Sequence, residues 1–151
     1  MTGTNHGLTG AVIALIVKRP ELALPLSFIS HFICDSIPHF GNPKMKLFGK
    51  SFTLMLTTDF LVAVSIMAGL AVLFPNQKWL IWECMILAAS PDLMWAYYRL
   101  YKEKIKHKAG VAFGPISRFH AWIQWSETVP GIFIEIGWFM LMTSIILGTK
   151  K

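Results

Sequence analysis

Long apolar stretches separated by short basic segments restrict the fold of this chain more than any other feature. The clearest stretch runs from Phe52 to Phe74 and contains one charged residue, Asp59. About 20 apolar residues cross the hydrocarbon core of a bilayer, so this stretch predicts a transmembrane helix. Only 15% of all residues are charged and 54% are hydrophobic, and the mean hydropathy is +0.53. Because soluble domains are about one-quarter charged, the sequence indicates an integral membrane protein.

Segments rich in Pro, Gly and Lys divide the 151 residues into five predicted helices of a single transmembrane domain. We expect them at about residues 4–17, 21–37, 52–74, 79–98 and 116–147. The predicted fold class is all-α: a compact bundle of four to five membrane-embedded helices, with the first two either crossing fully or forming a short, re-entrant hairpin. Gly7 with Ala11, and Gly10 with Ala14, form small-xxx-small pairs, which predict that another helix approaches the first one closely.

The net charge of +6 comes mostly from Lys and Arg in the segments between apolar stretches. No nucleic-acid-binding motif accompanies these residues, so they indicate contact with anionic lipid headgroups and no binding of nucleic acid. The positive-inside rule places the linkers after the second and fourth helices in the cytoplasm. Membrane lipid is therefore the expected partner, and the oligomeric state stays open.

Most of the aspartates and histidines are predicted to lie at the cytoplasmic level of the membrane. If the helices alternate in direction, the starts of the first, third and fifth helices share one side with the ends of the second and fourth. His31 and Asp35 lie one turn apart on the same face of the second helix. The ionisable residues expected at this level are His6, His31, Asp35, His39, Asp59, Asp92, His120 and Glu127.

These residue types indicate a metal site. Each uncompensated carboxylate within a membrane helix costs about 2.5–3.5 kcal/mol, so several at one level require a cation. Imidazole and carboxylate groups suit zinc, manganese or iron, and one or two such ions are expected. The predicted metal ligands are His6, His31, Asp35, Asp59, Asp92 and His39. The alternative is that the same groups form His–Asp pairs that only hold helices together.

Two further residues are predicted to take part in catalysis through proton transfer, His120 and Glu127. On a continuous fifth helix, both would share one inward face with Gln124 and Glu135, because all four positions fall within about 80° of one another. The alternatives are an interfacial histidine and a carboxylate that only stabilises the start of a helix.

The first 40 residues resemble a known family. An early His precedes Gly and small residues, and an apolar helix then ends in His31-x3-Asp35-x2-Pro38-His39. Together with Pro91-Asp92 at a later helix end, this pattern resembles the small membrane-bound, metal-dependent hydrolases of the inner membrane. The resemblance implies a prokaryotic inner-membrane location and hydrolytic activity.

The resulting hypothesis is a metal-dependent hydrolase that acts at the cytoplasmic interface on a membrane-borne, lipid-like ester or phosphoester. Two alternatives without enzymatic activity stay open. A divalent-cation or proton pathway would use the same residues and predicts polar side chains that continue across the membrane. A structural helix bundle predicts that no metal binds.

Overall fold

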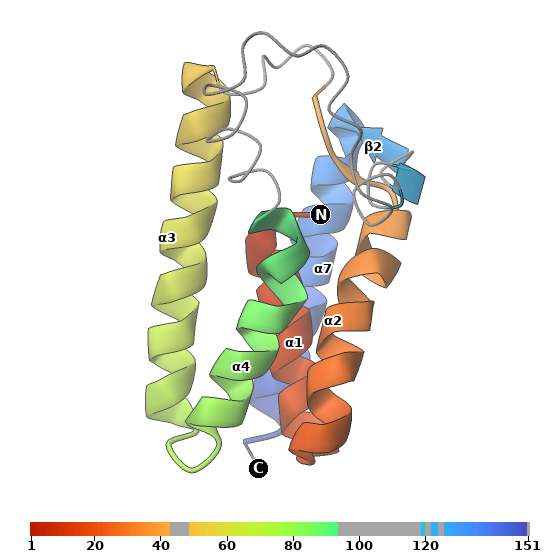
Figure 1. Ribbon diagram of the computed structural model, residues 1–151. Helices are drawn as coiled ribbons and strands as arrows, with labels where there is room; N and C mark the ends of the chain where they lie inside the picture. The colour runs from red at the N-terminus through yellow and green to blue at the C-terminus, as the bar shows by residue number, and fades with distance from the viewer. Residues whose placement is uncertain (43–48, 94–118, 120–121, 124–125, 151) are drawn as a thin grey trace, which may run out of the picture.

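A computed structural model describes residues 1–42, 49–93, 119, 122–123 and 126–150. The chain is mostly helical, as predicted, with five α-helices among these residues. The helices are α1 (Gly3–Val17), α2 (Pro20–Ser36), α3 (Lys50–Leu73), α4 (Lys78–Ala89) and α7 (Ile132–Gly148). The start of α1, the end of α2, the start of α3, the end of α4 and the start of α7 lie toward one end of the bundle (Figure 1). The predicted alternation of helix direction therefore agrees with the structure.

Helix α1 is the centre of the bundle and contacts each of the other four helices. Its small residues allow a neighbouring backbone to come very close. A Cβ atom added at Gly10 would lie 2.3 Å from the carbonyl oxygen of Cys84 in α4, and one at Gly7 would contact Met85. The close approach predicted at these two glycines is confirmed. The apolar core forms around this contact, with Leu8, Ala11, Leu15 and Ile81 almost fully buried.

Helices α2 and α4 both end near a proline, and both ends carry acidic residues. The buried residues of α2 recur every three or four positions, as expected for one helical face; they are Ala23, Ser27, Ser30, His31, Cys34 and Asp35. Helix α4 is followed by a short 3₁₀ turn, η1 (Ser90–Asp92), with Pro91 in its first turn. The prediction continued this helix to residue 98, whereas α4 ends at Ala89; residues 94–98 lie outside the described residues.

The fifth helix is shorter than predicted. It begins at Ile132, and the residues before it form strand β2 (Glu127–Thr128) and a 3₁₀ turn, η3 (Val129–Gly131). Strand β2 pairs in parallel with β1 (His39–Phe40), and the register sets His39 against Glu127.

Proline and glycine explain this difference. Thr128 is extended, and Pro130 lacks the N–H group that a continuing helix would need. Gly131 allows a close backbone contact, because an added Cβ atom would lie 2.0 Å from the carbonyl oxygen of His39. Glu127 and Glu135 consequently belong to different elements, so the prediction that they share one face of a single helix is wrong.

Among the residues that the structure describes, two helical segments are long and apolar enough to cross a membrane, by length and composition. They are Lys50–Leu73 and Val129–Gly148, with mean hydropathies of 2.0 and 1.8 in their most apolar parts. Only 6% of that part of α3 is buried, so its large apolar side chains face outward. Leu54, Phe60 and Val72 are among the most exposed of these side chains.

Candidate metal centre

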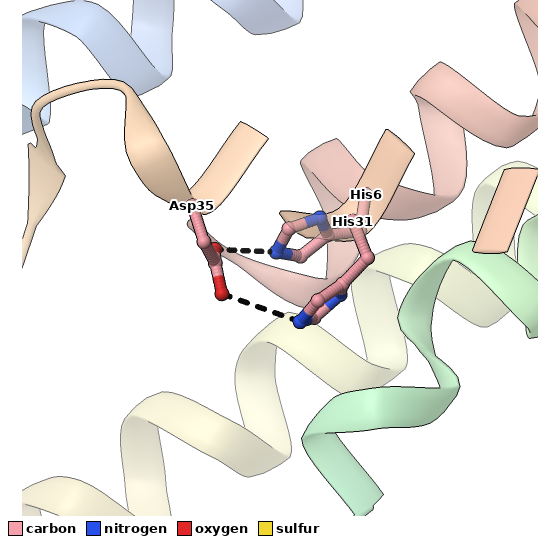
Figure 2. A group of neighbouring side chains, drawn as sticks. All are labelled: His6, His31 and Asp35. Atoms are coloured by element: carbon pink, nitrogen blue, oxygen red, sulfur yellow. Dashed lines mark hydrogen bonds and ion pairs between the residues drawn. The ribbon is translucent and has the colours of Figure 1, made fainter. Parts of the chain in front are cut away.

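Three predicted ligands from two helices meet in a fully buried group, shown in Figure 2. His6 comes from α1, whereas His31 and Asp35 come from successive turns of α2. The Nε2 atom of His6 lies 3.0 Å from Asp35 Oδ1, and Nε2 of His31 lies 3.2 Å from Asp35 Oδ2. One ligand atom from each residue lies within 4.8 Å of the others, so the group could hold a metal ion.

The two imidazoles lie against each other. Their ring centroids are 4.0 Å apart with an angle of 23° between the planes. Two positive imidazolium rings at this distance would repel each other strongly in a buried setting. One positive charge is enough to neutralise the Asp35 carboxylate, and the Met1 ammonium forms a buried ion pair with its Oδ1.

The orientation of His31 is set by a backbone group. Its Nδ1 lies 2.8 Å from the carbonyl oxygen of Ala88 in α4, and because a carbonyl only accepts, Nδ1 carries the proton. In the neutral ring the lone pair is then on Nε2, which faces the carboxylate of Asp35. A lone pair that faces a carboxylate oxygen in this way is a position where a metal ion could bind. Metal-binding histidines usually have this arrangement, with the other ring nitrogen donating to a carbonyl or a carboxylate.

Asp92 adds a second carboxylate on the open side of the group. Its Oδ1 lies 3.8 Å from His31 Nε2 and its Oδ2 lies 4.0 Å from His6 Nε2. The Asp92 side chain is 27% exposed, whereas those of the other three residues are completely buried. The 3₁₀ turn at Pro91 brings this carboxylate toward the imidazoles, so a partly exposed residue lies next to the buried group.

The donor atoms of His6, His31 and Asp35 lie close enough together for one metal ion, and Asp92 lies slightly farther from the imidazoles. With metal–ligand bonds of about 2.1 Å, the ligand atoms of a tetrahedral site lie about 3.4 Å apart. The measured nitrogen–oxygen separations run from 3.0 to 4.0 Å. Two imidazoles with carboxylates suit zinc, manganese or iron. The buried Nδ1 of His6 has no hydrogen-bond partner among the described residues.

Asp59 lies apart from this group. Its carboxylate accepts hydrogen bonds from the backbone nitrogens of Gly3 at 2.8 Å and Thr4 at 3.1 Å. Those amides belong to the first turn of α1, so Asp59 binds the start of the helix that carries His6. His120 lies outside the described residues.

His39 and Glu127 form a separate pair where β1 meets β2. His39 is buried, its Nδ1 donates to the carbonyl of Ile37 at 2.8 Å, and its Nε2 lies 3.8 Å from Glu127 Oε1. Burial lowers the pKa of His39, but the Glu127 carboxylate and the Ile37 carbonyl outweigh burial, so the pKa is raised above its usual value. The protonated ring is therefore favoured beside the carboxylate.

Two important groups were missing from the predicted site. Glu135 is buried and accepts hydrogen bonds from the backbone and hydroxyl of Thr2 and from the Asn5 amide. The sequence signal for this contact was the presence of polar residues, Thr2 and Asn5, at the start of an apolar helix. The contact with the Ala88 carbonyl could not be predicted from the sequence, because every residue type has the same backbone carbonyl.

The described residues thus define a helical chain with a buried group of two histidines and one aspartate that could hold a metal ion. No protein-family model, no curated protein and no solved structure matches this chain. The function is therefore inferred from the chemistry of the site.

Proposed function

We propose that this chain is a membrane-embedded, metal-dependent hydrolase that acts on a lipid-like ester or phosphoester. The observation that carries the proposal is the buried group of His6, His31 and Asp35, with donor atoms within 4.8 Å of one another. The hydrogen bond from His31 to the Ala88 carbonyl, which leaves Nε2 available as a ligand, supports it further.

Access and location also support this proposal. The group lies toward the end of the bundle where α2 ends, and the partly exposed carboxylate of Asp92 lies beside it. Catalytic metal sites keep an open position for water or substrate, whereas structural sites are closed by protein ligands. The outward-facing apolar surface of α3 is suited to lipid. A substrate that reaches the site from the membrane interface would itself be membrane-borne.

The residues would have distinct roles. His6, His31 and Asp35 would hold the metal ion, and Asp92 would complete the ligand set on the side where substrate arrives. A bound divalent ion supplies a nucleophile by lowering the pKa of its water, and it polarises the scissile group. Glu127 is 43% exposed and lies beside His39, so this pair is suited to exchange protons with solvent.

Elemental analysis of the detergent-purified protein tests the proposal. We expect zinc, manganese or iron at close to one ion per chain in the wild type, and a large loss in His31→Ala. His39→Ala is the matched control, because it removes a buried histidine that lies outside the group. The metal-loaded protein should then hydrolyse a lipid ester or phosphoester presented in mixed micelles, and His31→Ala should not.

Three results would overturn the proposal. One is the absence of metal in the wild type even after incubation with each divalent ion, which would favour a structural helix bundle. Another is an equal loss of metal in His31→Ala and His39→Ala, which would point to a general folding defect. The last is metal that exchanges across vesicle membranes without hydrolysis of any ester or phosphoester, which would favour a cation pathway.

A further inference from the structure

Two carboxylates from different helices hold the first turn of α1. The first amides of a helix have no partner within it, so they must bond elsewhere. Asp59 of α3 accepts from Gly3 and Thr4, one amide to each of its oxygens. Glu135 of α7 accepts from the backbone nitrogen of Thr2 at 3.0 Å.

Side chains strengthen the same contacts. The Thr2 hydroxyl donates to the Glu135 carboxylate at 2.9 Å, and the Thr4 hydroxyl donates to the Asp59 carbonyl at 3.0 Å. Gly3 allows this approach, because an added Cβ atom would lie only 3.0 Å from Asp59 Oδ2. Carboxylates beside a helix N-terminus also interact favourably with the helix dipole. The start of α1 is therefore held from two directions.

His6 follows these residues directly. It is the one member of the buried group that α2 does not carry, so its distance from His31 and Asp35 depends on where α1 lies. The Nε2 atom of His6 lies 3.0 Å from Asp35 Oδ1. Metal sites lose function when a ligand is displaced by about 0.5 Å, so this distance must be maintained closely. Movement of the first turn of α1 would be enough to remove His6 from the site.

We propose that Asp59 and Glu135 are positioning residues for metal binding, which hold the first turn of α1 so that His6 stays within ligand distance of the metal. This inference rests on the proposed metal site. It assigns two different tasks to four of the carboxylates near this end of the bundle: Asp35 and Asp92 face the imidazoles, whereas Asp59 and Glu135 bind the helix that supplies one imidazole.

A double-mutant cycle with zinc tests this role. We expect Asp59→Ala to weaken zinc binding by about 10–100-fold, the loss typical when a group that orients a metal ligand is removed. In a His6→Ala background the same substitution should cause no further loss, because Asp59 acts through His6. Glu83→Ala is the control, since Glu83 is an exposed carboxylate on α4 away from the start of α1; it should bind zinc as the wild type does.

X-ray absorption of the zinc-loaded proteins gives the number of imidazole ligands, which a loss of stability alone would not change. The wild type should show two imidazole ligands, and Asp59→Ala should show one. If Asp59→Ala does not fold, Asp59→Asn and Glu135→Gln each keep one accepting oxygen, and both should give intermediate affinity with two imidazoles.

The outcomes separate this inference from the proposed function. Wild-type affinity in Asp59→Ala, or an equal loss with and without His6, would overturn the positioning role while leaving the metal site in place. Failure of the wild type to bind zinc or any other divalent ion would instead overturn the metal site and this inference together.

Discussion

Substitution of Gly10 by alanine should destabilise the protein and disturb the metal site together. Gly10 is where α1 and α4 lie closest, and an added Cβ atom would lie 2.3 Å from the Cys84 carbonyl oxygen and 3.0 Å from the Met85 nitrogen. Ordinary contact begins at 3.4 Å, so the two helices must separate by about 1.1 Å. Both atoms belong to the backbone of α4, which cannot move aside as a side chain would.

The magnitude follows from overpacking. Extra atoms in a well-packed interior cost about 1–3 kcal/mol. For a chain of this size, we expect the Tm of the metal-free protein in detergent to fall by roughly 2–12 °C. His6 precedes Gly10 by one turn of α1, and Ala88, whose carbonyl orients His31, follows Cys84 by one turn of α4. A separation near 1 Å exceeds the tolerance of a metal site, so zinc affinity should fall as well.

Gly69→Ala and Gly137→Ala are the matched controls. Both glycines lie inside helices, and an added Cβ atom would meet nothing within 4 Å at either position. Because alanine is a better helix former by about 1 kcal/mol, these variants should be as stable as the wild type or slightly more stable. The reasoning is refuted if Gly10→Ala unfolds at the same temperature as the two controls.

Two other contacts give predictions that unfolding measurements can check. Thr9→Val should lower the free energy of unfolding by about 1–3 kcal/mol, because the Trp138 indole N–H donates to the Thr9 hydroxyl at 2.9 Å and would be left unpaired. Thr9→Ser keeps the hydroxyl and should cost much less; equal losses in the two variants would contradict the prediction. The raised pKa of His39 favours the folded state fully below the usual value of about 6.5, and this contribution should disappear as pH rises through the raised value. Unfolding measured across that pH range should show the dependence in the wild type and much less of it in Glu127→Gln, and identical pH profiles would refute it.

The sequence predicted the parts of the fold that depend on long, uniform patterns. Apolar stretches gave three of the helices to within a few residues at both ends, and alternation of helix direction brought the ionisable residues to one end. Spacing predicted His31 and Asp35 on one face, since four residues make about one turn. The start of the fifth helix was missed because the apolar residues on both sides of Pro130 and Gly131 were assigned to one continuous helix.

The site was harder to predict than the helices. The predicted membrane level gives the position of a residue along the bundle axis, but it does not give the direction in which the side chain points around that axis. Asp59 shares its level with His6, yet its carboxylate bonds to the backbone of α1, and only the packing of α3 on α1 decides this. His39 likewise follows α2 closely but pairs with Glu127, because parallel pairing of two short strands sets the register.

The arrangement of the carboxylates bears on how many metal ions the protein can hold. From residue type alone, the acidic residues and histidines at this level were compatible with one or two ions. In the structure, His6, His31 and Asp35 form one group that could hold a metal ion, and Asp92 lies beside its two imidazoles. The oxygens of Asp59 and Glu135 are instead occupied by hydrogen bonds from the start of α1. A second ion would have to break those bonds and leave amides of the first turn without partners, at about 1–3 kcal/mol for each. We therefore expect metal titration to saturate at one ion per chain, and saturation at two would refute this division of the carboxylates.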